Sequence, residues 1–208
     1  MKSVNKIKAV FFDYDGVLTL DKTGSITICK YLSFVTGIRL EAVTKAYRPF
    51  NSELLIGTKS HADMWNDFCD VLNVQIDEKH LIESFKSTPV NTEMINLALD
   101  LKSRGLSLGI ITDNKKDRIK YLRKFQNLDH IFDTIVVSSE LGSDKQSSEI
   151  YIKAIGDLNL TPEECVFIDN KESNLVIPSQ MRMHTIFHDD MVNDVELLKI
   201  KLFNLFYE

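Results

Sequence analysis

Residues 9–19 of the chain read Ala-Val-Phe-Phe-Asp-Tyr-Asp-Gly-Val-Leu-Thr. An apolar run ends there in two carboxylates, Asp13 and Asp15, and Gly16 follows. Because residues i and i+2 of an extended chain point to the same side, both carboxylates are expected to converge at the carboxyl end of one buried strand. Ligands bind at that end of the strands in open α/β sheets. Two like charges there require compensation, and a divalent metal with oxygen ligands, typically magnesium, is the simplest one.

Two other interpretations of this motif compete with the catalytic one. Asp15-Gly16 is a strong signal for a β-hairpin turn, after which Val17–Leu20 would return as a short strand. A calcium loop of the EF-hand type fits poorly, because Val17 stands where that loop requires a further oxygen ligand. Two acids two positions apart at the end of an apolar run favour a catalytic motif over a turn alone.

Composition places the chain among ordinary globular proteins. Its 208 residues are 44% hydrophobic and 26% charged, which allows one good-sized domain or one domain with a small insert. The net charge of -5, without a long basic run, argues against nucleic acid as a main partner. The densest basic cluster is Lys115, Lys116, Arg118 and Lys120, and its spacing predicts a solvated helix face.

The cysteines and the apolar segments bear on the cellular setting. The three cysteines are far apart and none lies in a Cys-x-x-Cys pair, so neither a disulfide framework nor a zinc site is expected. A reducing, cytoplasmic setting is the natural inference. No stretch approaches the roughly 20 apolar residues that span a bilayer, and Asp13 interrupts the N-terminal apolar run. We therefore expect no membrane partner and no signal peptide.

Short apolar runs alternate with amphipathic segments over most of the chain. This alternation is typical of repeated βα units and predicts an α/β fold with a mostly parallel sheet covered on both faces. Strands are predicted over Ile7–Phe12, Leu106–Thr112, Thr134–Ser138, Cys165–Asp169 and His184–Phe187. Helices are predicted over Glu93–Arg104, Lys116–Phe125, Ser147–Asp157 and Ser173–Met181, with a short turn at Thr161–Glu164. A last helix, Val195–Phe206, is expected to pack on the sheet, but its apolar side would also suit an interface, which leaves a monomer or a homodimer open.

Residues 21–87 break this alternation and contain no convincing strand. Helices are predicted there over Ile26–Val35, Leu40–Tyr47, Lys59–Leu72 and Glu78–Phe85, with a loop over Asn51–Gly57. The economical interpretation is an all-helical insert in a core domain that comprises residues 1–20 and 88–208.

Three more predicted strand ends carry polar residues. Thr112-Asp113-Asn114 ends the second strand. A hydroxyl at this place, beside the backbone N–H groups that enter a helix, can bind a phosphate. Taken alone, however, Thr112 or Asp113 is more typical of a helix N-cap. Lys145 stands in the loop after the third strand, a place where a lysine is usually solvated. Asp169-Asn170 ends the fourth strand, so an apolar strand again ends in an acid, as it does at Asp13. The alternative is that Asp169 caps the helix that follows.

The order Asp-x-Asp-Gly-Val, Thr, Lys, Asp, each at or just after its own predicted strand, resembles the four-motif pattern of the haloacid dehalogenase-like hydrolases. The resemblance covers residues 5–20 and 90–190. From Ser138 to His188 the sequence is similar to small sugar-phosphate phosphatases and to the amino-terminal phosphatase domain of soluble epoxide hydrolase. It implies a Rossmann-like three-layer core with a mostly parallel sheet and a small all-helical cap domain, residues 21–87, called the cap below.

The resemblance also implies a magnesium-dependent phosphatase that acts on a small phosphorylated metabolite. Asp13 is then the nucleophile that forms an aspartyl-phosphate, and Asp15 is the general acid and base. Lys145 neutralises charge on the nucleophile and the transferring group. Asp169 binds Mg²⁺ together with the Asp13 carboxylate and the Asp15 carbonyl group. Family members that cleave carbon–halogen bonds lack an acid at the Asp15 position, so phosphate esters are favoured over haloacids.

The same resemblance assigns the residues that bind substrate. Thr112 and the backbone amide of Asp113 would hold phosphoryl oxygens. The family often has asparagine in place of Asp113, so we expect this carboxylate to point away and Asn114 to supply the amide. Asn170 stands where a second acid is common, and Asn170 and Asn174 are expected to support the metal site.

In this family the cap closes over the site and selects the substrate. Arg39 is the predicted substrate-binding residue of the cap, because an arginine can pair with a second anionic group. Tyr47, Arg48, His61 and Trp65 are further candidates, although a lone tryptophan on a helix is more typical of a core. A small cap favours a small-molecule phosphate ester as partner. Two alternatives remain: a phosphomutase-type phosphoryl transferase, and a non-catalytic binding or regulatory protein on the same fold.

Overall fold

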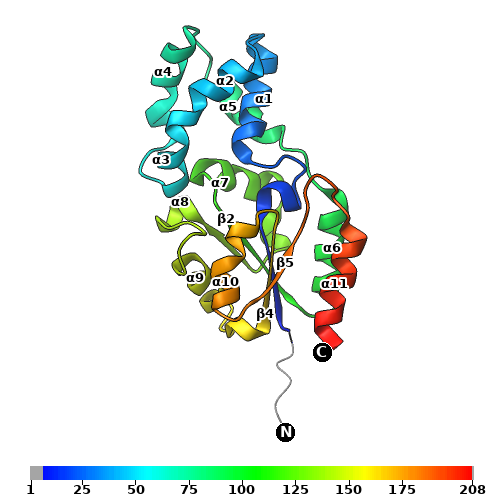
Figure 1. The fold of residues 1–208 in the computed structure, drawn as a ribbon. Helices are drawn as coiled ribbons and strands as arrows, with labels where there is room; N and C mark the ends of the chain where they lie inside the picture. Colours follow the sequence, from blue (N-terminus) through cyan, green and yellow to red (C-terminus); the bar gives the residue numbers. More distant parts are fainter. Residues whose placement is uncertain (1–6, 208) are drawn as a thin grey trace.

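The computed structural model describes residues 7–207 and places five parallel strands in one sheet, in the order β3-β2-β1-β4-β5 (Figure 1). Within it, Phe12 of β1 lies beside Ile110 of β2 and Ile168 of β4, so these three strands end at one edge. The strands are β1 (Ala9–Phe12), β2 (Ser107–Thr112), β3 (Thr134–Val137), β4 (Cys165–Asp169) and β5 (His184–Phe187). The predicted α/β fold with a parallel sheet is confirmed.

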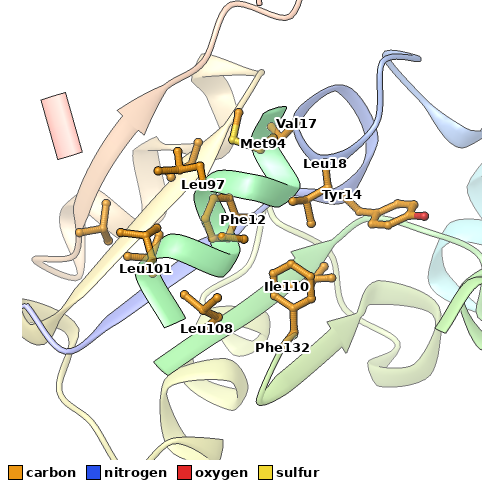
Figure 2. Close-up of a cluster of buried hydrophobic side chains, with 14 of the residues drawn as sticks. Phe12, Tyr14, Val17, Leu18, Met94, Leu97, Leu101, Leu108, Ile110 and Phe132 are labelled. Carbon is orange, nitrogen blue, oxygen red and sulfur yellow. The ribbon is translucent and has the colours of Figure 1, made fainter. Parts of the chain in front are cut away.

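Helices cover both faces of the sheet. Val10 and Phe12 point to one face, which is covered by α6 (Thr92–Ser103), α7 (Lys116–Phe125) and α11 (Val195–Tyr207). Figure 2 shows Met94, Leu97 and Leu101 of α6 packed around Phe12 in this layer. The opposite face is covered by α9 (Glu149–Asp157) and α10 (Val176–Gln180). Full burial of a side chain such as Leu101 contributes about 1.5–3 kcal/mol, so each layer is held by apolar packing.

Five helices form the cap, above the carboxyl edge of the sheet (Figure 1). They have an apolar core of their own, in which Trp65 is buried and donates from Nε1 to the Ile76 carbonyl oxygen at 2.9 Å. This agrees with the core interpretation of that tryptophan. The helices are α1 (Gly24–Thr36), α2 (Leu40–Tyr47), α3 (Asn51–Ile56), α4 (His61–Leu72) and α5 (Lys79–Lys86).

Two local predictions and one alternative are wrong. The loop expected over 51–57 is mostly helix α3, because Pro49 sits in the first turn of a short 3₁₀ segment, where proline is tolerated, and the chain continues into helix. The single helix expected over Ser173–Met181 is a 3₁₀ turn, Glu172–Asn174, followed by α10. Residues 17–20 do not return as a strand, because the chain turns at Asp15 and Gly16, whose backbone angles are non-helical, and the Thr19 amide closes the turn on the Tyr14 carbonyl oxygen at 3.0 Å.

Two chain segments join the core and the cap, and they run side by side. Thr19 pairs with Val90 in a single antiparallel bridge, and the Leu20 amide donates to the Pro89 carbonyl oxygen at 2.8 Å. Asn91 adds a donor bond from Nδ2 to the Val17 carbonyl oxygen at 3.0 Å. The cap is therefore attached by a paired linker directly after the first motif. Across residues 7–207, no helix combines the length and the apolar character needed to cross a membrane.

Candidate active site

The polar residues at the strand ends meet at one cavity between the core and the cap. Asp13 follows β1, and Thr112 ends β2. Together with Lys145, from the loop before α9, they line a cavity of about 280 Å³. Asp169 ends β4 and is fully buried directly behind Lys145. The parallel register brings together residues that are far apart in the sequence.

Lys145 joins the two carboxylates. Its Nζ lies 2.7 Å from Asp13 Oδ1 and 2.7 Å from Asp169 Oδ2, and all three side chains are buried. Burial raises the pKa of Asp13 to about 8, while the ammonium of Lys145 opposes that rise. Burial also works against the charge of Lys145, but the two carboxylates raise its pKa above the usual range. The solvated alternative for this lysine is wrong, because it is the counter-ion of the site.

Asp15 is held by a residue that the sequence did not single out. Arg118 donates from Nη1 to Asp15 Oδ2 and from Nη2 to Asp15 Oδ1, both at 2.9 Å. Asn114 Nδ2 donates to the same Asp15 Oδ2 at 2.7 Å. Arg118 is fully buried and also donates to Thr88 Oγ1, on the second linker, at 3.2 Å. A bidentate guanidinium–carboxylate pair fixes both the position and the orientation of the carboxylate.

The predicted solvated face of α7 is therefore wrong for Arg118 and for Lys115, which are both buried. Lys116 and Lys120 are exposed, as expected. One sequence signal could have identified Arg118. It lies four residues before Leu122 and next to Ile119, both of which are buried on the inner side of α7. An arginine on the apolar stripe of a helix points to a buried partner.

The turn after Asp13 depends on Gly16. This glycine has φ 81°, and a Cβ there would lie 2.1 Å from Asn170 Nδ2. Asn170 therefore packs directly on the turn that carries Asp15. Asn174 donates from Nδ2 to both oxygens of Asp169, at 3.2 and 3.1 Å, which agrees with the supporting role expected for it.

The three residues at the end of β2, Thr112-Asp113-Asn114, have different surroundings. Thr112 is buried and lines the cavity, and Asp113 accepts a hydrogen bond from the Lys145 amide at 3.0 Å. Neither residue caps α7, whose N-cap is Lys115, so the capping alternative is wrong. Burial raises the pKa of Asp113. Asn114 was expected to bind substrate, but it does not line the cavity, because its amide group is committed to Asp15 and Thr112.

The structure does not bring Arg39 to the cavity. This arginine is exposed and precedes α2, beyond the end of α1 that lies far from the core (Figure 1). Because the 13-residue helix α1 is about 20 Å long, Arg39 lies too far away to contact a ligand near Asp13. The cap residues that line the cavity are Lys22, Thr23, Gly24, Ser25, Asn51 and Leu55. The small residues among them, Thr23, Gly24 and Ser25, leave no signal in a single sequence.

The other aromatic candidates of the cap serve its packing and its contact with the core. Tyr47 is buried, and its hydroxyl lies 2.7 Å from His61 Nε2. His61 Nδ1 lies 2.7 Å from Asp117 Oδ2 at the start of α7. These partners fit a ring that accepts through Nε2 and donates through Nδ1. His61 therefore joins the two parts of the chain instead of facing the ligand cavity.

The oxygen donors of the site fit a small divalent cation. Asp13 and Asp169 share one ammonium group, so their carboxylates lie close together in a buried setting where two negative charges need more than one counter-charge. No third acidic, histidine or cysteine side chain joins them within residues 7–207. Two carboxylates supplemented by carbonyl oxygens and water are a donor set typical of Mg²⁺.

Comparison with known proteins agrees with this geometry. Residues 7–174 match the sequence profile of the haloacid dehalogenase-like hydrolases. The chain belongs to this family. A family enzyme from Bacteroides thetaiotaomicron has the same fold, with a TM-score of 0.73 at 20% identity over 93% of this chain and 98% of that one. A structure of that enzyme in complex with magnesium and inorganic phosphate gives a TM-score of 0.68 at 20% identity over 88% of this chain and 95% of that one.

Two curated relatives extend the comparison. Bifunctional epoxide hydrolase 2 of Rattus norvegicus is 24% identical over 93% of this chain and 38% of that protein. Pyrophosphatase PpaX of Bacillus cereus is 25% identical over 82% of this chain and 78% of that protein. The chain spans less than two fifths of the length of the epoxide hydrolases that it matches.

Proposed function

We propose that this protein hydrolyses a small phosphate monoester through an aspartyl-phosphate on Asp13, with Mg²⁺ as its cofactor. The observation that carries the proposal is the buried triad Asp13–Lys145–Asp169, with both ion pairs at 2.7 Å, at a cavity also lined by Asp15 and Thr112. Residues 21–87 act as the cap domain and residues 1–20 with 88–208 as the core domain. The magnesium–phosphate complex of the Bacteroides thetaiotaomicron enzyme supports this chemistry.

The first half-reaction transfers the phosphoryl group to the protein. A carboxylate oxygen of Asp13 attacks phosphorus, the bond from phosphorus to the ester oxygen breaks, and that oxygen takes a proton from Asp15. The Thr112 hydroxyl and the Asp113 amide donate to the phosphoryl oxygens, and the Lys145 ammonium offsets their charge. Arg118 and Asn114 hold the Asp15 carboxylate in place during this exchange.

The second half-reaction regenerates the carboxylate. Asp15 accepts a proton from water, whose oxygen attacks phosphorus, and the bond from phosphorus to the Asp13 oxygen breaks. Inorganic phosphate leaves. Asp13, Asp169 and the Asp15 carbonyl group would hold Mg²⁺, which when bound lowers the repulsion between the carboxylates and a phosphate dianion.

The test is phosphate release from para-nitrophenyl phosphate and from a panel of sugar and nucleotide monophosphates, with MgCl₂ or with EDTA. We expect magnesium-dependent release by the wild-type protein and a loss of at least about 10⁴-fold in Asp13→Asn, which removes the nucleophile at constant volume. Asp129→Asn, an exposed aspartate on the core, is the matched control and should keep full activity. Activity that survives in Asp13→Asn would contradict the covalent mechanism.

A further inference from the structure

Lys115 is a buried cation in the cavity wall, and the proposed mechanism does not use it. It is 3% exposed and lines the cavity beside Lys22, Ser25 and Asn51. Its Nζ donates to Ser25 Oγ at 2.6 Å, and that hydroxyl in turn donates to Asn51 Oδ1 at 2.7 Å. The lysine thus extends from the core to the first and third helices of the cap.

No carboxylate balances the charge of Lys115. Within residues 7–207 it forms no ion pair, whereas the neighbouring buried cations Arg118 and Lys145 both bind carboxylates. Burial, helped by the charge of Arg118, lowers the pKa of Lys115 to about 8. Among the described residues, the ammonium has one hydrogen-bond partner, Ser25, and the Tyr47 ring centroid 6.0 Å away, both neutral. A buried ammonium with only neutral partners carries a desolvation cost, and an anion from the cavity would offset that cost.

The amino end of α1 lies at the same part of the cavity. Thr23 caps this 13-residue helix by accepting from the Ile26 amide, but the amides of Gly24 and Ser25 meet no acceptor in the described part of the chain. Both residues line the cavity. A helix amino terminus carries a partial positive charge and open N–H groups, and both favour an anion. The buried ammonium and the helix end therefore both favour an anionic ligand.

We propose that the substrate carries a second anionic group, a carboxylate or a second phosphate, which Lys115 and the amino end of α1 bind while Asp13 attacks the first phosphate. The proposal rests on the proposed phosphatase function. It transfers to Lys115 the role that the sequence assigned to Arg39. The cavity of about 280 Å³ suits a small metabolite with two charged ends rather than a polymer.

The surroundings of Lys115 leave this charge available to a ligand. Asp15 is occupied by Arg118, and Asp117 by His61, so neither carboxylate neutralises Lys115. The remaining groups that face it are neutral or cationic. The titratable groups around Lys115 are Arg118 and Asp117 of α7, Asp15 after β1, Cys29 of α1, Tyr47 of α2 and Lys22 of the linker.

The test uses three compounds with one three-carbon skeleton. They are 3-hydroxypropyl phosphate, 3-(phosphonooxy)propanoate and 1,3-propanediol bisphosphate, whose second ends are neutral, a carboxylate and a phosphate. We measure kcat/KM in the wild-type protein, Lys115→Met and Lys116→Met, all with MgCl₂. Binding is measured separately by calorimetry in the Asp13→Asn background, so one readout does not depend on turnover. Lys116 is the matched control, because it is adjacent in sequence but exposed and outside this cavity.

We expect the wild-type protein to prefer at least one of the two compounds with an anionic second end over the hydroxyl compound by at least about tenfold. Which of the two is preferred identifies the second group. Lys115→Met should reduce that preference to about one without a comparable loss on the hydroxyl compound, and Lys116→Met should keep it. An equal rate and affinity for all three compounds in the wild-type protein, or an equal loss on all three in Lys115→Met, would overturn the proposal.

A second measurement needs no variant. The preference of the wild-type protein should fall as the pH rises from 7 to 9, because Lys115, whose pKa is lowered to about 8, loses its proton while the carboxylate stays ionised and the phosphate only gains negative charge. A preference that does not change over this range would count against Lys115. Different results contradict the two proposals. If the wild-type protein hydrolyses all three compounds equally, the proposed phosphatase function stands and the proposed second-anion site is wrong. Failure to hydrolyse or bind any of the three contradicts both.

Discussion

The cavity residues of the core and those of the cap are positioned by different kinds of secondary structure. Core residues come from the ends of parallel strands, so Asp13, Thr112 and Asp169 are placed by backbone hydrogen bonds that involve nearly every strand residue. Cap residues come from the ends of helices, where Ser25 and Asn51 are placed by how α1 and α3 pack. The sheet therefore fixes the core side of the cavity, whereas the position of the cap side depends on the contacts between the two parts.

These contacts combine a few hydrogen bonds with apolar packing of Tyr121 of α7 against Phe85 of α5, whose ring centroids lie 6.1 Å apart. Ser138 on α8 (Ser138–Leu141) accepts from the Asn114 amide at 3.0 Å and donates to the Leu55 carbonyl oxygen of α3 at 2.6 Å. Lys115 bonds Ser25, and His61 bonds Asp117. Because the cap keeps its own apolar core, these bonds can change without unfolding either part. Variants in the core should therefore affect stability and chemistry together, whereas variants at the cap contacts should affect affinity.

Lys145→Met should give the largest effect, because it leaves the buried carboxylates of Asp13 and Asp169 without their shared counter-ion. We expect a loss of about 3–5 kcal/mol in the free energy of unfolding and a loss of activity of at least about 10²-fold. Urea denaturation and phosphate release measure the two. Lys59→Met, which removes an exposed cap ion pair with Glu53, should change neither.

Arg118→Met should come next, because it removes the bidentate partner of Asp15. If Arg118 positions the general acid, loss of rate should be larger for an alkyl phosphate than for para-nitrophenyl phosphate, whose leaving group needs little protonation. We expect a difference of about tenfold between the two substrates, and Arg118→Lys should restore part of it. The same loss on both would mean that Arg118 has only a structural role. Arg123→Met, which removes a half-buried arginine of α7 that pairs with Asp129 and does not line the cavity, is the control.

Two glycine variants compare the core and the cap directly. Gly16 and Gly37 both have positive φ, 81° and 70°, but only Gly16 has a neighbour where a Cβ would stand. Gly37→Ala should cost about 1 kcal/mol of stability and leave kcat/KM within about twofold, since only backbone strain changes. Gly16→Ala should cost about 1–3 kcal/mol and at least about tenfold in activity, because Asn170 must move. Thermal unfolding and phosphate release test both, and equal activity losses would contradict the comparison.

Asp117→Asn should give the smallest effect. Although burial opposes it, the hydrogen bond with His61 helps to hold the pKa of Asp117 below its usual value. A carboxyl group with a lowered folded-state pKa stabilises the protein above its unfolded pKa, and that contribution is lost as the pH falls through the folded value. We therefore expect the wild-type protein to be more stable than Asp117→Asn by at most about 1 kcal/mol at pH 7, with the difference shrinking below about pH 4. A difference that grows toward low pH would show that another group is responsible.

The core was predictable from the sequence because its information is local. An apolar run ending in acids two positions apart indicates a buried strand with a polar end, and parallel strands covered by helices bring such ends to one edge. Asp13 and Asp169 emerged from this pattern, whereas Lys145 and the supporting Asn174 were assigned only through the resemblance to the four-motif family. The boundaries that failed, such as α3 and the helix expected over Ser173–Met181, lie where a proline or a short turn interrupts a helical pattern.

Only the tertiary structure decided which charges are buried and paired. The basic run from Lys115 to Lys120 has the spacing of a solvated face, yet packing turns Lys115 and Arg118 inward, one toward the cap and one onto Asp15. Arg39 has the chemistry of an anion-binding residue, but a helix about 20 Å long separates it from the site. A sequence states which groups a chain carries and the period at which they recur. The partners of those groups depend on distances between elements that are far apart in the chain.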